Sequence, residues 1–101
     1  MRYADIFEEC EQLLAQRGKG YGDAHRLHKA IAGRMTSVIG VDRLSGSPLS
    51  AYEAARLLAE LKGARLDVDY SEDSLLDQIN YLVIALSIKR AEVSQGQANE
   101  V

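Results

Sequence analysis

Cysteine, proline and the large aromatic residues tryptophan and phenylalanine are scarce or absent in this chain of 101 residues. Cys10 is the only cysteine, which excludes an intrachain disulfide. Tryptophan is absent and phenylalanine occurs once, so the core must be aliphatic, and such a composition favours helices over sheets. Proline occurs only at Pro48, so the apolar stretches that lack it are free to form helices of several turns.

Long apolar runs and an excess of positive charge are also missing. No segment approaches the roughly 18 consecutive apolar residues of a membrane-spanning helix, and the N-terminus opens on a charged amphipathic segment. The formal net charge is −3, so no basic field collects the phosphates of a long nucleic acid. We therefore expect a cytoplasmic protein that binds neither a membrane nor a long nucleic acid.

Apolar residues recur at three- and four-residue steps in four segments, which is the spacing of amphipathic helices. The expected helices cover residues 3–17, 24–39, 51–66 and 72–92. Ser50 and Glu53 have the spacing of a capping box at the start of the third. Residues 40–49 are rich in turn formers and are expected to be a mobile loop. The sequence thus predicts an all-α, four-helix chain that forms a compact bundle.

The expected domain covers residues 1–92, and residues 93–101 are expected to be a disordered tail because the apolar period is lost there. A chain of this size buries only a limited share of its surface. The apolar face of the last helix is broader than one neighbour would cover. That face contains Leu75, Leu76, Ile79, Leu82, Val83 and Leu86. We therefore expect a homo-oligomer.

Charged residues lie within the helices that are expected to be most buried. Lys62 and Arg65 align with Leu58 and Leu61 on the expected inward side of the third helix, where two cations need an anion. The fourth helix carries a polar stripe that could face them, formed by Asp73, Asp77, Asn80 and Tyr81. The set is either a structural ion-pair network or the lining of a pocket. In a pocket, the cations would meet a ligand phosphate, and the carboxylates would meet ribose, a base edge or Mg²⁺.

The glycine-rich segment 18–23 offers a second anion site. Successive backbone N–H groups in such a turn can form a nest, with Arg17 and Lys19 adding positive charge and Tyr21 placed to stack on a base. The spacing matches neither a dinucleotide-binding fingerprint nor a phosphate-binding Walker loop. A plain turn between two helices is the alternative interpretation.

Other reactive side chains give weaker signals. His25 and His28 are three residues apart on a helix, but no third metal ligand can be identified, so a solvent-facing polar pair is the favoured interpretation. Cys10 lies at helical spacing among apolar residues and is expected in the core. No nucleophile elbow accompanies the serines, so no catalytic residue is assigned.

Three motifs together resemble an uncharacterised domain family of phages and prophages. They are Tyr21-Gly22-Asp23, Leu61-Lys62-x-x-Arg65-Leu66 and Asp73-Ser74-x-x-Asp77-x-x-Asn80-Tyr81. The resemblance covers most of residues 5–90. Because the family has no assigned function, it implies an origin and a residue pattern but no reaction.

The segment Asp77-x-x-Asn80-Tyr81-Leu82 is also similar to the last metal-binding helix of the MazG-like, all-α nucleoside triphosphate pyrophosphatases. These are oligomeric helical bundles that hydrolyse nucleotides with Mg²⁺, so the resemblance implies Asp73 and Asp77 as metal ligands. Their preceding core helix carries a Glu-Glu-x-x-Glu cluster. This chain has Lys62 and Arg65 there instead, which would repel a metal but suit a phosphate.

Three hypotheses of function remain open. The favoured one is a phage-type protein that binds a small phosphorylated nucleotide without a cofactor, in a pocket built by the third and fourth helices. By analogy with phage proteins that sequester nucleotide immune signals, it would act as a sponge in the host cytoplasm. The candidate ligand-binding residues are Arg17, Lys19, Tyr21, Lys62, Arg65, Asp73, Asp77, Asn80 and Tyr81. The alternatives are a MazG-like hydrolase that uses Asp73 and Asp77 with Mg²⁺, and a structural or partner-binding helical protein without a ligand.

Overall fold

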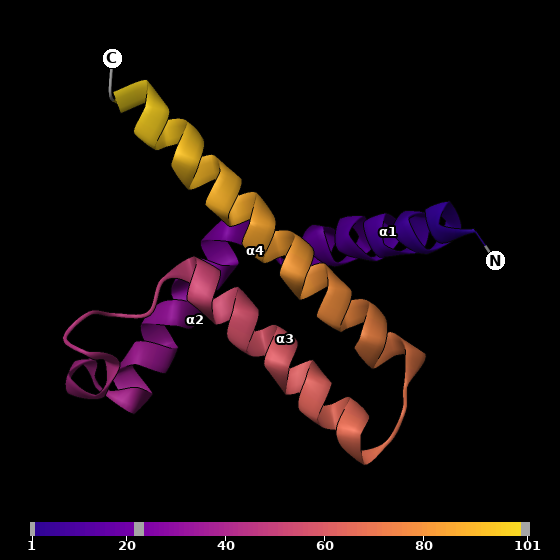
Figure 1. Ribbon diagram of the computed structural model, residues 1–101, viewed down its shortest axis with the longest axis horizontal. Helices are drawn as coiled ribbons and strands as arrows, with labels where there is room; N and C mark the ends of the chain where they lie inside the picture. Colours follow the sequence, from indigo (N-terminus) through magenta and orange to yellow (C-terminus); the bar gives the residue numbers. More distant parts are fainter. Residues whose placement is uncertain (1, 22–23, 100–101) are drawn as a thin grey trace.

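The computed structural model describes the backbone of residues 2–21 and 24–99 and the side chains of residues 2–18 and 24–95. These residues form four α-helices, one short 3₁₀-helix and no strand (Figure 1). The elements are α1 (Tyr3–Tyr21), α2 (Ala24–Ile39), η1 (Val41–Leu44), α3 (Ala51–Val68) and α4 (Glu72–Asn99). The prediction of an all-α, four-helix chain is confirmed. None of the described helices has an apolar stretch long enough to cross a membrane.

Helices α3 and α4 form an antiparallel hairpin at the centre of the molecule and share its most extensive helix contact (Figure 1). Small residues recur on α3 at four-residue steps, namely Ala51, Ala55, Ala59 and Gly63. Ala55 is fully buried and packs with Ile84, Ala85 and Ile88 of α4. Since helix separation depends on the side chains at the contact, this row lets the two backbones approach closely.

This inner face of α3 differs from the expected one. Leu58 and Leu61 were expected on the inward side, together with Lys62 and Arg65. Leu61 is instead 53% exposed, and Arg65 is exposed as well. The prediction was wrong for these two residues because it followed the largest apolar side chains. Close contact between two helices favours the face with the smallest side chains instead.

Hydrogen bonds hold both ends of the connection between α2 and α3. The Ser50 hydroxyl accepts a hydrogen bond from the Glu53 N–H (3.1 Å), and Glu53 Oε1 accepts one from the Ser50 N–H (3.0 Å), which confirms the capping box. On α2, the buried Thr36 hydroxyl donates to a carbonyl of its own helix (2.7 Å) and accepts from the Leu49 N–H (2.9 Å). The segment that was expected to be a mobile loop therefore contains η1 and is bonded at its end.

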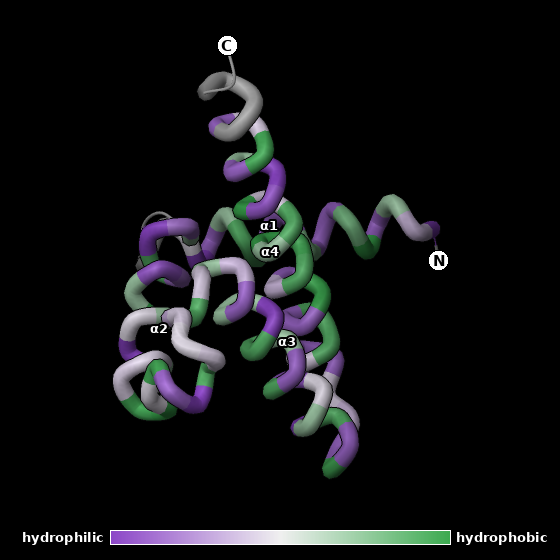
Figure 2. The backbone as a smooth tube through the Cα atoms, turned by 60° about the vertical axis from the view of Figure 1, so that its left-hand side comes forward, coloured by the Kyte–Doolittle hydropathy of each residue, from purple (hydrophilic) through white to green (hydrophobic). Residues whose placement is uncertain are grey.

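Helix α1 packs on the body mainly through its C-terminal half, and its N-terminal half stands away from the other helices (Figure 1, Figure 2). Leu14 packs against the core, and Cys10 is buried as expected, whereas Phe7 is 68% exposed. Burial raises the pKa of the Cys10 thiol, with a smaller contribution from the negative charge of Glu9. The radius of gyration is 15.3 Å, above the roughly 13 Å of a compact chain of this length.

Two helices extend past their expected ends. α1 continues through Gly18 to Tyr21, although a break was expected after Arg17. A glycine costs only about 1 kcal/mol inside a helix, which the continued backbone hydrogen bonding of the helix offsets. α4 continues to Asn99, past the expected end near Glu92. Its described side chains beyond that point, residues 93–95, are exposed, so packing against the rest of the chain does not account for this extension.

The tight contact between α3 and α4 gives a first prediction. Ala55→Leu should lower the free energy of unfolding by about 1–3 kcal/mol or more, because the added atoms must push Ile84 and Ile88 away. Urea denaturation followed by circular dichroism measures the change. Ala64→Leu, at an exposed position of the same helix, serves as the matched control and should change it by less than about 0.5 kcal/mol. Equal effects of the two substitutions would contradict the packing described.

A second prediction concerns the end of α4. Truncation after Glu92 should leave the melting temperature nearly unchanged, since the side chains at 93–95 are exposed and bury no core surface. Truncation after Ser87 should lower it strongly, because this also removes the buried Ile88. Differential scanning calorimetry of the two truncated chains checks both outcomes. A large fall in the first chain would mean that the last turns contribute to the fold.

Candidate functional site

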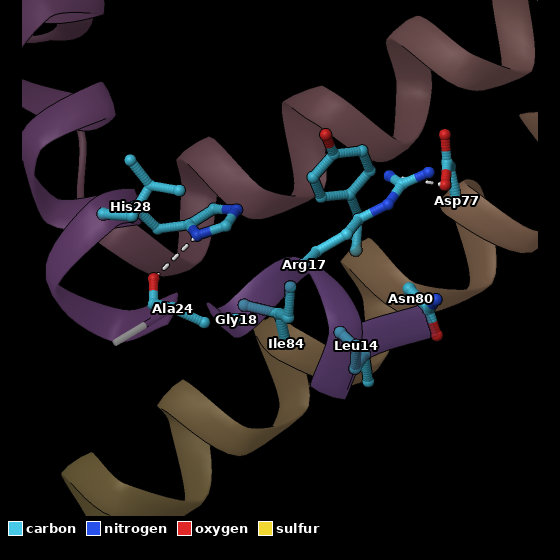
Figure 3. A pocket seen from close by; sticks show the side chains of 10 residues that line it. Leu14, Arg17, Gly18, Ala24, His28, Asp77, Asn80 and Ile84 are labelled. Atoms are coloured by element: carbon cyan, nitrogen blue, oxygen red, sulfur yellow. Dashed lines mark hydrogen bonds and ion pairs between the residues drawn. The ribbon is translucent and has the colours of Figure 1, made fainter. Parts of the chain in front are cut away.

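A cavity of about 450 Å³ lies between the C-terminal end of α1, the first turns of α2 and the middle of α4 (Figure 3). Leu14, Leu27 and Ile84 give it apolar walls. Its polar side chains are Arg17, His28, Asp77, Asn80 and Tyr81. A mostly apolar cavity with a few convergent polar groups is the usual form of a small-molecule site, and such sites have volumes of about 300–1,000 Å³. We therefore take this cavity as the candidate functional site.

Asp77 lies at one end of the cavity and joins three helices. It is 5% exposed, and it forms ion pairs with one cation from α1 and one from α3. Arg17 Nη1 lies 2.7 Å from Asp77 Oδ1, and Lys62 Nζ lies 3.1 Å from Asp77 Oδ2. Because one carboxylate meets two cations, this group carries a net positive charge beside the cavity.

Three buried acceptor atoms at the cavity lack a hydrogen-bond partner within the described part of the chain. They are His28 Nε2, Asp77 Oδ1 and Asn80 Oδ1. Asp77 Oδ1 has its ion pair with Arg17, but the N–H groups of the guanidinium are not aligned for a hydrogen bond to it. Buried polar atoms in folded proteins are nearly always hydrogen-bonded. Two of the three, His28 Nε2 and Asn80 Oδ1, have neither a hydrogen bond nor an ion pair within the described residues, which makes them candidate contacts for a ligand with hydrogen-bond donors.

The hydrogen bonding of His28 determines which of its nitrogen atoms is available. Its Nδ1 lies 2.8 Å from the carbonyl oxygen of Ala24, and a carbonyl oxygen can only accept. In the neutral ring the proton is therefore on Nδ1, so Nε2 is an acceptor. His28 is 3% exposed, and its ring meets that of Tyr81 edge to face, with ring centroids 5.9 Å apart. The imidazole is thus held in one orientation.

The three acceptors are distributed across the cavity. In Figure 3, His28 lies on one side, Asp77 and Asn80 lie on the other, and Arg17 reaches between them. The acceptors thus belong to two sides of the cavity, one formed by α2 and the other by α4.

The structure brings some of the sequence-predicted site residues together and separates others. Arg17, Asp77, Asn80 and Tyr81 line the cavity, and Lys62 is bound to Asp77. Arg65 is exposed at a different surface hollow beside Leu61 and Val68, and Asp73 is exposed at a third hollow beside Glu9 and Glu72. The side chains of Lys19 and Tyr21 lie outside the described residues.

The position of the cavity also differs from the expected one. The pocket was expected between the third and fourth helices, whereas the cavity is lined by α1, α2 and α4. The row of small residues on α3 closes the space between α3 and α4. The expected glycine nest is not formed by residues 18–21, because they are helical and their N–H groups point along the helix. Residues 22–23 lie outside the described part of the chain.

His28 was missed as a site residue. The interpretation of a solvent-facing histidine pair is wrong for His28, which is buried, while His25 Nε2 lies 3.0 Å from the Ser87 hydroxyl on α4. A signal was present, since His28, Ala32 and Thr36 recur at four-residue steps and all three are buried. These residues are small or polar, so an analysis of hydrophobic periodicity does not find the face that they form.

The described residues contain no group of three or more His, Cys, Asp or Glu side chains that could hold a metal ion. The two carboxylates that the MazG resemblance implied as ligands, Asp73 and Asp77, border different hollows. The ion pairs of Asp77 with Arg17 and Lys62 further oppose binding of a cation there.

A comparison with protein families identifies the family of this chain. A family model described as a domain of unknown function, DUF6378, matches residues 5–89. The chain belongs to the DUF6378 family. The match includes every residue that lines the cavity of this DUF6378 domain, together with Lys62. No curated protein and no solved structure matches the chain. The predicted membership in a domain family without an assigned function is thus confirmed.

The ion pairs of Asp77 give a third prediction. Lys62→Met should lower the free energy of unfolding by roughly 1–3 kcal/mol, because the buried carboxylate loses its more buried partner. Arg17→Met should cost less than about 1 kcal/mol, since the Arg17 side chain is 47% exposed and solvent screens the pair. Urea denaturation at neutral pH compares the variants, with the exposed Arg65→Met as the matched control. A larger cost for Arg17→Met than for Lys62→Met would contradict this description.

Proposed function

We propose that this DUF6378 domain binds a small phosphorylated nucleotide in the cavity between α1, α2 and α4. The observation that carries the proposal is the pair of buried acceptors His28 Nε2 and Asn80 Oδ1, which have no partner among the described residues and lie at one cavity with the Arg17 guanidinium. A nucleotide supplies what this set lacks. Its base and ribose have N–H and O–H donors for the acceptors, and its phosphate pairs with the guanidinium.

The distribution of the groups suggests how such a ligand is oriented. The base would lie against Tyr81 and Leu27 and donate an N–H to His28 Nε2, since base stacking on aromatic rings is favourable and tolerant of geometry. Ribose hydroxyl groups would donate to Asn80 and Asp77. The phosphate would meet Arg17, where the net positive charge of the Arg17, Lys62 and Asp77 group compensates its negative charge.

Binding without turnover is favoured over hydrolysis by the same geometry. A MazG-like mechanism needs several carboxylates around Mg²⁺, but Asp77 is engaged by two cations and Asp73 borders a different hollow. A purely structural role would account for the Asp77 ion pairs, but not for the unpartnered atoms of His28 and Asn80. A phage origin and a role as a sponge for nucleotide signals accord with binding that leaves the ligand intact, and both stay predictions.

A fourth prediction tests the binding. Isothermal titration calorimetry with nucleoside mono- and triphosphates and cyclic dinucleotides, with and without Mg²⁺, should find a nucleotide that binds one site per chain. Arg17→Met and Asn80→Leu should each weaken its binding by about tenfold or more, because each removes a hydrogen bond to the ligand. Arg65→Met is the matched control, because Arg65 lies outside the cavity. This variant should bind the nucleotide with the affinity of the unaltered chain.

Recovery of the ligand distinguishes the hypotheses. After heat denaturation of the loaded protein, chromatography should return the nucleotide unchanged, as a binding protein requires. Products that appear only with Mg²⁺ would support the hydrolase instead. Retention of no nucleotide, or equal loss of affinity in Arg65→Met and Arg17→Met, would overturn the proposal.

A further inference from the structure

Helix α4 carries two stripes of residues on different sides. The inner stripe faces the rest of the chain and contains the buried residues Asp77, Asn80, Ile84, Ala85 and Ile88. The outer stripe contains Leu75, Ile79, Leu82 and Leu86 at steps of four, three and four residues, and Val93 lies on the same side seven residues beyond Leu86, past Lys89. Four of these side chains are 39–54% exposed, and Ile79 is half-buried. Much of α4 is accordingly coloured as hydrophobic in Figure 2.

The spacing of the outer stripe is that of a coiled-coil seam. Apolar residues that alternate at four- and three-residue steps pack into the side chains of a second helix with the same pattern. In this chain α3, α1 and α2 lie along the inner stripe, and the outer one is left in solvent. Val83, which is 45% exposed, widens the outer stripe. A helix with apolar residues on two sides is typical of one that lies between two partners.

The charges along α4 indicate what the second partner is. Glu72 lies beside the N-terminal end of the outer stripe, and Lys89 and Arg90 lie towards its C-terminal end, where Lys89 Nζ is 3.5 Å from Glu92 Oε2. A parallel second copy of α4 would bring like charges together. An antiparallel copy places the acidic end of each helix near the basic end of the other, which is the favourable arrangement.

The stripe is also complementary to itself in that orientation. If the two-fold axis passes between Ile79 and Leu82, Leu75 of one copy lies opposite Leu86 of the other, and Ile79 lies opposite Leu82. Such an arrangement, in which the same patch serves both partners, is what a two-fold dimer requires. We propose that a second copy of this chain docks antiparallel on the outer stripe of α4, with the axis between Ile79 and Leu82.

The dimer is independent of the nucleotide site. Asp77, Asn80 and Ile84 face the cavity from the inner stripe, so association through the outer stripe leaves both cavities open. The proposal therefore does not rest on the proposed function.

Sedimentation equilibrium at micromolar concentrations tests the association. The unaltered chain should have twice the mass of one chain, and Leu82→Glu should halve it, because a carboxylate would be buried at the seam. Val38→Glu is the matched control, since Val38 is 87% exposed on α2 and lies on another helix. This variant should stay dimeric. Circular dichroism verifies that both variants are folded. A monomeric unaltered chain, or dissociation of both variants, would overturn the proposal.

Disulfide cross-linking tests the orientation without a disruptive substitution. In a Cys10→Ala background, Leu75→Cys and Leu86→Cys chains are mixed and oxidised. The antiparallel arrangement should give the mixed disulfide between the two, since those positions face each other. Disulfides between two Leu75→Cys chains, without the mixed product, would mean a parallel pair and would overturn the proposed arrangement.

Discussion

The close contact between α3 and α4 rests on alanine and glycine side chains, and much of the remaining structure depends on it. Ala55 and Ala59 are almost fully buried, and an added Cβ at Gly63 would lie only 3.0 Å from the Gln78 side chain. Because these residues are small, the hairpin is tight but buries little apolar volume. No large side chain is fully buried among the described residues. Apart from Ile84 and Ile88, larger apolar residues of both helices, such as Leu61, Leu82 and Leu86, are left exposed on other faces, where they can meet another molecule.

The same contact explains where the polar groups lie. With the space between α3 and α4 closed, Asp77 is buried at the edge of the hairpin, where Lys62 reaches it from α3 and Arg17 from α1. A buried carboxylate is tolerated only with such partners. The Arg17 pair and the packing of Leu14 hold the C-terminal half of α1 against α4. The cavity lies beside them, between α1, α2 and α4.

Helix α4 thus contributes to two surfaces, the lining of the cavity and the exposed apolar stripe. Its inner stripe combines core residues with the polar lining of the cavity, and its outer stripe is apolar and exposed. A mixed inner stripe contributes less hydrophobic stabilisation than a fully apolar one would. Burial of the outer stripe in a dimer would add hydrophobic stabilisation without blocking the cavity. It would offset the small apolar volume that one chain buries in its own core.

The sequence by itself determined the helical class, the bounds of α2, the capping box at Ser50 and the burial of Cys10. These follow from local periodicity and backbone hydrogen bonding, which depend on near neighbours in the chain. It also singled out Lys62, Asp77, Asn80 and Tyr81, because polar groups within apolar helices are unusual, and Arg17, because it adds positive charge beside the glycine-rich segment. Only the tertiary structure decided that Arg65 and Asp73 lie apart from them and that His28 joins the cavity. Those outcomes depend on which faces of α3 and α2 turn inward. The inward face of each helix is set by how well its side chains fit, in shape and size, against those of neighbouring helices. The spacing of apolar residues along one helix does not specify this fit.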